Sequence, residues 1–346
     1  MPFHANWIAS LSPWPREFGL GRIQALLERL GNPERRFDSI HVVGSNGKST
    51  ATRTIAELSR RAGRRAGAYT SPHVSGWAER IWVDGQEADF ERAIARIRRP
   101  AEALGATQFE ALTAAAFAEF AAASVEVAAV EAGLGGRLDA TNVVAAPVVL
   151  LTNVTNEHAD VLGETPDQIA REKLAVAHAA RIVVLPDNTY AHLVPHAEIR
   201  LGGAREAAEA YLGAPIAADV DVRLAGRLEQ RNGTVLDGAH TPEAAEWLLE
   251  RLPDRDYVLC VSMLRDKDAD AVLRRLARAG TTLVATRSSN DRALDEKELG
   301  RYAEPYFQHV ETVADPRKAL ERARALGPRV LVTGSLYLLA DLSSSD

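Results

Sequence analysis

The 346-residue sequence contains a single cysteine, Cys260, so no disulfide can form within the chain. Cys260 lies in the apolar run YVLCVSML, and free cysteine is among the most often buried residue types, which predicts a packing role. No stretch approaches the roughly 18 apolar residues that a membrane-spanning helix needs. The opening MPFHANWIASLSPWP lacks the basic start and apolar run of a secretory signal. These absences predict a cytoplasmic protein without a membrane segment.

The chain also lacks an excess of charge of either sign. It has 41 Lys and Arg residues against 47 Asp and Glu residues, a formal net charge of −6, which gives no support to nonspecific binding of nucleic acid or anionic membranes. Neither an H-E-x-x-H motif nor paired cysteines occur, which argues against a zinc site. A G-x-S-x-G nucleophile motif is absent too, which argues against a serine hydrolase.

What the sequence does contain is a regular alternation of short apolar runs and longer amphipathic segments. Such alternation is typical of a mostly parallel α/β sheet flanked by helices. The expected strands are 40–44, 65–71, 125–133, 147–154 and 181–186, and the expected helices are 48–63, 90–105, 109–124 and 165–180.

The periodicity fades between 187 and 227, where we expect at most one short helix, and the part near 214–226 reads as a connection. Beyond it the alternation resumes, which predicts a second, smaller α/β domain, since the chain is longer than one core usually holds. Expected strands there are 233–237, 256–264, 281–287 and 329–335, with helices after 241 and over 268–280 and 315–327.

The stretch HVVGSNGKST (41–50) has the context of a phosphate-binding loop, because a buried strand precedes it and a helix follows. Gly44 and Gly47 would let the backbone N–H groups point inward, toward a ligand at the positive end of the helix. Lys48 would add a charge for the β- and γ-phosphates, and Ser49 or Thr50 a hydroxyl near Mg²⁺. The general pattern G-x-x-x-x-G-K-[ST] wants glycine at 42, where Val42 stands, so a simple helix-start turn is the alternative.

Three further stretches carry polar residues where strands end. Glu131 ends a strand and precedes the glycine-rich GLGGRLDATN, a position at which α/β sheets bind ligands; a flexible surface loop is the alternative. His158 follows a strand end and Lys173 lies on a helix, although residues of these kinds are, taken alone, more often solvated. Asp237 and His240 lie in a strand-to-helix turn, LDGAHTPEAA, in which Thr241 would cap the helix before Pro242.

In this order the motifs resemble the folylpolyglutamate synthase/dihydrofolate synthase family, a branch of the Mur-ligase-type amide ligases. The similarity covers most of the chain and rests on GLGRIQALLERLGNP, IHVVGSNGKST, YTSPHV, FEALTAAAF, VEAGLGGRLDATN, HADVLGETPDQIAREK, LAGRLE, LDGAHTPEAA, SMLRDKD and TGSLYLLADL. It implies an N-terminal P-loop domain with a mostly parallel sheet (1–218), a connection (219–227) and a smaller Rossmann-like α/β domain (228–346).

The resemblance implies an ATP-dependent ligase that activates a carboxylate as an acyl phosphate and joins it to the amino group of L-glutamate. The acceptor would be dihydropteroate, a reduced folate, or both, and the protein would be a monomer that binds neither nucleic acid nor membrane. ATP and two Mg²⁺ sites are the implied cofactors.

Residue by residue, the resemblance implies three groups of ligands. For ATP they are Gly44, Ser45, Asn46, Gly47, Lys48, Ser49, Thr50, Arg227 and Asp237. For Mg²⁺ they are Thr50 or Ser49, Ser71, Glu131 and His158. Asp139 and Ala140 match the pterin side, Lys173 matches a lysine that is often carbamylated in the family, and His240 sits in a turn facing the cleft, so that Lys48, Glu131, His158, Lys173 and His240 are the catalytic candidates.

Some positions depart from the family pattern. Glu157 stands where aspartate is usual, Thr241 replaces an asparagine, and LA precedes Gly226 in place of Trp-Pro. The span from Lys173 to Arg227 is short and lacks an H-Q-x-x-N-A element, which in relatives helps to hold the nucleotide base. Two alternatives therefore stay open: the same ligase chemistry on a non-folate carboxylate, and a nucleotide-binding protein without catalysis.

Overall fold

The computed structural model describes residues 3–13, 15, 17–155 and 159–343. The chain divides into two compact units, the first comprising Met1–Pro72 and Trp77–Val222 and the second His73–Gly76 and Arg223–Asp346. The segment His73–Gly76 thus belongs to the second unit although it lies within the first in sequence. Its Val74 is buried in the same apolar cluster as Leu338 and Leu339.

The first unit is built on an eight-stranded sheet with the order β4-β3-β2-β5-β1-β6-β7-β8. Only the pairs β2·β3 and β3·β4 are antiparallel. The strands are β1 (Asp38–Val43), β2 (Ala66–Tyr69), β3 (Ile81–Val83), β4 (Gln86–Glu87), β5 (Val127–Glu131), β6 (Val148–Leu151), β7 (Ile182–Leu185) and β8 (Glu198–Leu201).

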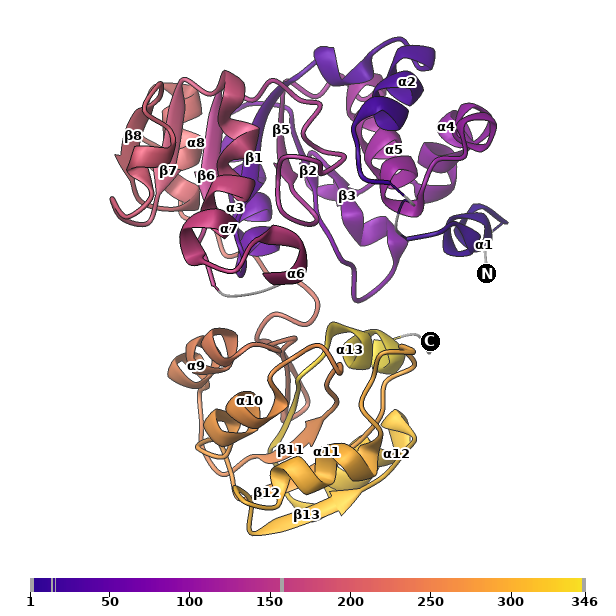
Figure 1. The fold of residues 1–346 in the computed structure, drawn as a ribbon, viewed down its shortest axis with the longest axis vertical. Coiled ribbons are helices and arrows are strands. Elements are labelled where there is room, and N and C mark those ends of the chain that lie inside the picture. Colours follow the sequence, from indigo (N-terminus) through magenta and orange to yellow (C-terminus); the bar gives the residue numbers. More distant parts are fainter. Residues whose placement is uncertain (1–2, 14, 16, 156–158, 344–346) are drawn as a thin grey trace. The chain divides into compact units, whose positions relative to one another are not determined.

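Helices cover this sheet (Figure 1). On one side α3 (Lys48–Arg61) and α8 (Ala204–Leu212) pack on an apolar cluster that includes Ile40 and Val42 of β1. A second cluster contains Val43 of β1 and is filled mainly by α4 (Phe90–Leu104) and the alanine-rich α5 (Gln108–Ala122). The remaining helices are α1 (Phe3–Ser10), α2 (Gly21–Arg29), α6 (Ala159–Leu162), α7 (Pro166–Leu174) and the 3₁₀ helices η1 (Pro33–Arg35), η2 (Trp77–Arg80), η3 (Ala175–Ala179) and η4 (Ala191–Leu193).

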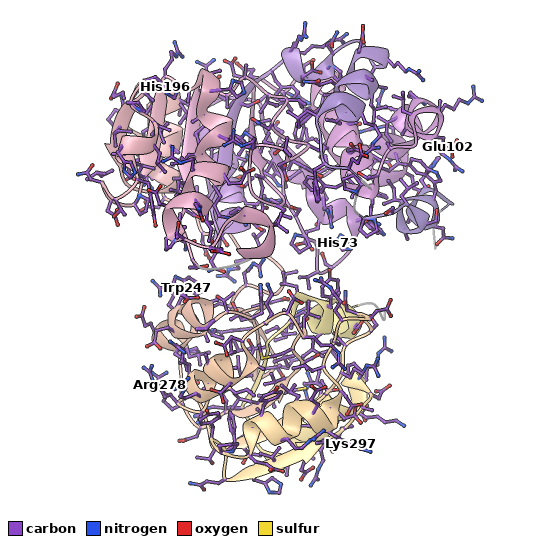
Figure 2. All side chains as sticks on the ribbon, in the orientation of Figure 1. His73, Glu102, His196, Trp247, Arg278 and Lys297 are labelled. Atoms are coloured by element: carbon purple, nitrogen blue, oxygen red, sulfur yellow. The ribbon has the colours of Figure 1, made fainter. Side chains whose placement is uncertain are left out.

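The second unit has a six-stranded sheet, order β13-β12-β11-β14-β10-β9, in which only β10·β9 is antiparallel. Its strands are β9 (Glu229–Arg231), β10 (Thr234–Leu236), β11 (Val258–Val261), β12 (Thr282–Ala285), β13 (His309–Thr312) and β14 (Val330–Thr333). Its helices are α9 (Pro242–Arg251), α10 (Ala269–Leu276), α11 (Glu296–Ala303), α12 (Pro316–Leu326) and α13 (Leu336–Ser343). Charged side chains such as Arg278 and Lys297 project from its outer surface (Figure 2).

The predicted α/β class with two mostly parallel sheets is confirmed. The stretch 187–227 holds more structure than expected, namely η4 and β8 as well as the helix α8. β8 is an edge strand in which the charged Glu198 and Arg200 alternate with Ile199 and Leu201, and none of the four residues is buried, so no apolar run marks it. α11 and β13 were also unexpected. The prediction for Cys260 is confirmed: its side chain is buried, and burial raises the pKa of the thiol to about 12. Among the described residues, no helix combines the length and apolar composition needed to cross a bilayer.

Candidate active site

The predicted site residues that the structure describes in the first unit lie in or beside the segments that follow β1, β2 and β5. These three strands are neighbours and run parallel, so the segments that follow them meet at one edge of the sheet. The connection after β1 leads past β5 to β2, whereas the connection after β5 leads past β1 to β6, in the opposite direction along the sheet. A strand order that reverses in this way is the usual place for a ligand in an open α/β sheet.

The loop between β1 and α3 has the backbone form of an anion-binding turn. Val42 is fully buried in β1, so the position at which the general pattern wants glycine is strand interior. Gly44 has φ +145°, and a Cβ there would lie 2.0 Å from the Thr152 hydroxyl oxygen. Gly47 has φ +79° at the start of α3, which has no side-chain cap among the described residues. The first N–H groups of a helix have no partner within it and attract an anion.

The segment after β6 supports this loop. The Asn153 side-chain oxygen Oδ1 accepts hydrogen bonds from the backbone N–H of Ser45 (3.2 Å) and Asn46 (2.9 Å). Thr152 Oγ1 donates to Asn46 O at 2.8 Å. The Asn46 amide nitrogen Nδ2 is buried and has no partner among the described residues, as an amide left for a ligand would.

Two lysines converge on one carbonyl oxygen of the loop. Lys48 Nζ donates to Gly44 O at 2.9 Å and to Ser45 O at 3.1 Å. Lys173 on α7 also donates its Nζ to Gly44 O, at 2.9 Å, and its side chain is almost fully buried, unlike the solvated helical lysine expected from sequence alone. Two ammonium groups this close repel one another, so the pair favours a neighbouring polyanion.

A buried carboxylate lies beside the loop. Glu131, at the end of β5, is 1% exposed; its Oε1 accepts from Ser49 Oγ at 3.0 Å and its Oε2 from Ser71 N–H at 2.9 Å. Ser49 therefore contacts Glu131, whereas Thr50 is exposed on α3. Arg80 is also buried, and although burial lowers its pKa, the charge of Glu131 acts to raise it. The predicted ligand His158 lies outside the described residues.

The glycine-rich segment after Glu131 folds back on α7. A Cβ on Gly136 would lie 2.4 Å from Lys173 O and 2.8 Å from Glu172 O, so only glycine allows this approach. Asp139, predicted to contact substrate, is buried; its Oδ2 accepts from Gly133 and Leu134 N–H, both at 2.9 Å. Burial raises the pKa of Asp139 above its ordinary value, although the hydrogen bonds from Thr141, Leu134 and Gly133 act to lower it. Ala140 is buried in the apolar core. Their contact with substrate stays a prediction.

We expect Gly136→Ala to reduce the free energy of unfolding by about 1–3 kcal/mol and to lower activity, because the methyl group must displace backbone rather than a flexible side chain. Chemical denaturation and steady-state rates measure the two effects. Gly21→Ala is the matched control, since a Cβ there meets nothing within 4 Å. Equal stability of the two variants would contradict the close packing of the loop on α7.

His41 on β1 predicts a pH effect on stability. Burial, with a contribution from the charge of nearby His178, lowers the pKa of His41 from 6.5 to about 3. Between these values the unfolded chain binds a proton that the folded chain does not, so stability falls as pH drops from about 6.5 toward 3, by up to ~1.4 kcal/mol per pH unit. His41→Gln should therefore show a shallower loss of stability than the wild type over pH 6–4 in denaturant titrations. Parallel slopes for wild type and His41→Gln would refute the buried neutral ring.

In the second unit the predicted residues Arg227, Asp237 and His240 lie around one turn. The Asp237 carboxylate, at the end of β10, accepts from Leu228 and Ala239 N–H at 2.9 Å each. Burial raises its pKa, and the N–H bonds and the charge of Arg227 act to lower it. A Cβ on Gly238 would lie 2.9 Å from an Arg227 guanidinium nitrogen, so glycine makes room for that side chain. His240 Nδ1 hydrogen-bonds to Gly238 O at 2.8 Å.

The predicted cap of the following helix is confirmed. Thr241 Oγ1 accepts from Ala244 N–H at 3.2 Å, and Pro242 begins α9. The turn therefore owes its shape in part to ordinary helix-start chemistry. The contribution of Arg227, Asp237 and His240 to ligand binding stays a prediction.

No group of three or more His, Cys, Asp or Glu side chains suited to a metal ion occurs within the described part of the chain. His192 and His196 are four residues apart, yet His192 Nε2 bonds to Asp167 and His196 Nε2 to Ala177 O. Among the described residues, a metal at Glu131 would find oxygen donors such as the Ser49 hydroxyl, which Mg²⁺ commonly uses.

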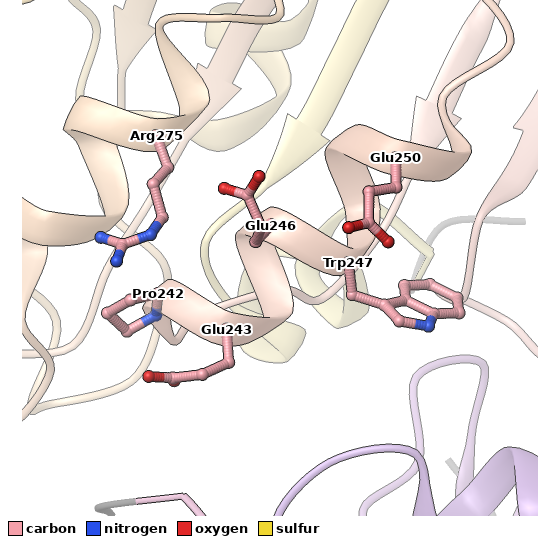
Figure 3. A pocket seen from close by; sticks show the side chains of 6 residues that line it. All are labelled: Pro242, Glu243, Glu246, Trp247, Glu250 and Arg275. Carbon is pink, nitrogen blue, oxygen red and sulfur yellow. The ribbon is translucent and has the colours of Figure 1, made fainter.

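A shallow hollow of about 460 Å³ lies on the outer face of α9 (Figure 3). Its lining carries three carboxylates, from Glu243, Glu246 and Glu250, and one guanidinium, from Arg275 of α10. It contains none of the predicted site residues. The carboxylates outnumber the single cation, which disfavours an anionic ligand such as a nucleotide or glutamate there.

Sequence reasoning missed three residues of the first site. Asn153 and His41 hold loops by hydrogen bonds, and Arg80 balances the charge of Glu131. Asn153 could have been found, because it follows a buried strand just as Glu131 does. His41 could have been found as the single ionisable residue in an otherwise apolar strand core, IHVV.

Two family models match the chain. The Mur ligase middle domain matches residues 42–200, and the Mur ligase, glutamate ligase domain matches residues 226–336. The first match spans the phosphate-type loop, Glu131 and Lys173. The second spans Arg227, Asp237 and His240.

Individual relatives agree with these models. A dihydrofolate synthase/folylpolyglutamate synthase from Mycobacterium tuberculosis is 30% identical over 90% of this chain and 84% of its own length. The structure of Escherichia coli FolC in complex with DHPP and ADP has a TM-score of 0.86, with 26% identity over 98% of this chain and 96% of that one. A bifunctional folylpolyglutamate synthase/dihydrofolate synthase with Mn, AMPPNP and L-glutamate bound has a TM-score of 0.85, with 25% identity over 98% and 97%. The chain belongs to the dihydrofolate synthase/folylpolyglutamate synthase family of ATP-dependent glutamate ligases.

Proposed function

We propose that the protein joins L-glutamate to the carboxylate of dihydropteroate or of a reduced folate at the expense of ATP. The observation that carries the proposal is the convergence of Lys48 and Lys173 on Gly44 O, at the uncapped start of α3 and beside the buried Glu131. Cations, free N–H groups and a carboxylate together suit a metal-bound polyphosphate. Relatives with bound DHPP, nucleotide and L-glutamate support the choice of substrates.

The triphosphate would lie along the loop from Gly44 to Thr50. Its oxygens would accept hydrogen bonds from the first N–H groups of α3 and from the Asn46 amide, whose Nδ2 has no other partner among the described residues. The ammonium group of Lys48 would neutralise the charge that builds on the transferring phosphoryl group, and so would that of Lys173 as long as it is unmodified. Catalysis of this transfer rests mainly on positioning and electrostatics.

The residues beside the loop fit Mg²⁺. Glu131 offers a carboxylate and Ser49 a hydroxyl, and both are hard oxygen donors of the kind that Mg²⁺ takes together with phosphate oxygens. Ser71 and His158 are further candidate ligands from the family resemblance, which implies two Mg²⁺ sites. Bound Mg²⁺ would withdraw charge from the phosphate oxygens and favour displacement at the γ-phosphorus.

The reaction would proceed in two displacements. A carboxylate oxygen of the acceptor attacks the γ-phosphorus while the bond to ADP breaks, which yields an acyl phosphate. The neutral amine of L-glutamate then attacks the acyl carbon, phosphate leaves with the C–O bond electrons, and the nitrogen gives up a proton. Water must be kept from the acyl phosphate, since hydrolysis would waste ATP.

For the second unit we propose, from the family resemblance, that Arg227 and Asp237 are ATP ligands and that His240 is a catalytic residue. The two N–H bonds to Asp237 hold the backbone of the connection and of the turn together, which fixes Arg227 beside Gly238. From the family resemblance we also propose that the functional domains are 1–218 and 228–346 and that residues 219–227 connect them.

The proposal is tested by measuring the phosphate that is released from ATP in the presence of Mg²⁺. We expect rapid release only when L-glutamate and dihydropteroate or tetrahydrofolate are both present. Release with glutamate and a non-pteridine carboxylate, and none with any folate acceptor, would overturn the assignment of the acceptor.

A further inference from the structure

A buried chain of polar side chains connects β1 to the glycine-rich loop 133–142. His41 on β1 is fully buried, and its Nε2 lies 2.9 Å from Thr141 Oγ1. Thr141 Oγ1 in turn lies 2.5 Å from Asp139 Oδ1. All three side chains are almost or completely out of contact with water, so their hydrogen bonds are strong and costly to break.

The direction of each hydrogen bond follows from the donors available. Both Asp139 oxygens accept from backbone N–H groups, Oδ1 from Thr141 (3.0 Å) and Oδ2 from Gly133 and Leu134, which is the pattern of an ionised, acceptor-only carboxylate. The single proton of the Thr141 hydroxyl therefore points to Asp139. Its lone pair must accept from His41, so the His41 proton is on Nε2.

The opposite nitrogen agrees with this tautomer. His41 Nδ1 is buried and has no partner among the described residues. Burial without a hydrogen bond costs more free energy for a nitrogen that carries a proton than for one that carries only a lone pair. Burial also lowers the pKa of His41 to about 3, so the ring stays neutral near pH 7. The chain of bonds is thus fixed, with His41 donating to Thr141 and Thr141 donating to Asp139.

The loop held in this way lies between two groups of the candidate site. It begins two residues after Glu131, and its far side packs on α7, where Arg137 N–H donates to Glu172 O at 3.1 Å and Gly136 touches Lys173 O. A shift of the loop would therefore move Lys173 relative to Glu131. Misplacement of about 1 Å can cost a hundredfold in rate.

We propose that His41 and Thr141 are positioning residues, which act through Asp139 to hold the loop 133–142 and thereby set the acceptor and Lys173 against the phosphate-binding loop. The proposal rests on the proposed function for the identity of the acceptor. His41 lies three residues before Gly44 on the same strand. The strand that carries the nucleotide loop thus also anchors the loop for the acceptor.

The test compares Thr141→Val, which keeps the shape and removes the hydroxyl, with Thr141→Ser, which keeps the hydroxyl. We expect Thr141→Val to lower kcat/KM for dihydropteroate by about tenfold to a hundredfold, because a loop displaced by up to about 1 Å misplaces the reacting groups, and to leave the KM for ATP within about twofold of the wild-type value. The kcat/KM of Thr141→Ser for dihydropteroate should stay within about threefold of the wild-type value. A lower Tm of Thr141→Val with unchanged kcat and acceptor KM would indicate a stabilising role only and would overturn the proposal.

A double variant tests whether His41 acts through Thr141. His41→Leu alone should resemble Thr141→Val, and the two changes together should cost no more than either one, because they break the same chain. Losses that multiply in the double variant would overturn the proposed route.

Hydrogen exchange keeps the test independent of the acceptor. The amides of Gly133, Leu134 and Thr141 should be protected in the wild type and exchange at least about tenfold faster in Thr141→Val, while amides of α12 should not change. If the wild type turned over no pteridine acceptor, the proposed function would fail, yet loss of protection would still support the anchored loop. Unchanged protection would contradict it.

Discussion

Lys48→Ala is expected to lower ATP-dependent phosphate release by at least about a hundredfold while leaving the fold intact, as removal of one preorganised donor to developing charge commonly does. Lys48 Nζ bonds only to backbone carbonyls of its own loop in the hydrogen bonds shown for it, so its loss removes no link between distant elements. The backbone loop remains held by Asn153 and Thr152. Rates with saturating ATP, L-glutamate and acceptor measure the effect.

Lys297→Ala is the matched control, because Lys297 is an exposed lysine on α11 (Figure 2). It should keep wild-type rates, and circular dichroism should be the same for both variants and the wild type. If the rate of phosphate release by Lys48→Ala lay within a few-fold of the wild-type rate, this loop would not hold the reacting phosphates.

Lys173→Ala is expected to abolish measurable ligase activity. Lys173 is almost fully buried, its Nζ bonds to Gly44 O, and its backbone carbonyl packs against Gly136, so it links α7 to both loops of the candidate site. Removal of the Lys173 ammonium group also leaves the buried Gly44 carbonyl oxygen with one donor fewer. The measurement is phosphate release, with denaturant titration to confirm that the variant is folded.

The same variant tests for carbamylation of Lys173, which we propose from the family resemblance. A carbamate would convert the buried ammonium into an anion and relieve its repulsion with Lys48 across Gly44 O. If Lys173 is carbamylated, short carboxylates such as acetate should restore part of the activity of Lys173→Ala, and bicarbonate should stimulate the wild type. An unmodified mass for the peptide with Lys173 and no rescue by carboxylates would argue for the plain lysine.

Much of the fold could be predicted from the sequence because most strands are buried on both faces. Their apolar runs, such as those of β1, β6 and β11, stand out between amphipathic helices. β8 and β13 lie at sheet edges and carry exposed polar side chains, so they lacked this signal. The assignment of His73–Gly76 to the second unit depends on contacts of Val74 with residues far along the chain, which no local pattern encodes.

The candidate site was predictable where a residue type and its place after a strand coincide, as for Lys48 and Glu131. Lys173 was less predictable, because its burial comes from the packing of α7 on the glycine-rich loop. Hydrogen-bond partners were beyond reach: the Asp139 side chain could be chosen from its motif, but its bonds to Gly133, Leu134 and Thr141 depend on the folded loop.

The central claim is tested most directly by the mass of the product formed from ATP, Mg²⁺ and L-glutamate with each of a panel of acceptors. The panel contains dihydropteroate, tetrahydrofolate and carboxylates without a pteridine ring. We predict that dihydropteroate or tetrahydrofolate gains the mass of at least one glutamate residue and that the other carboxylates do not. A panel in which no pteridine acceptor gains a glutamate would contradict the account.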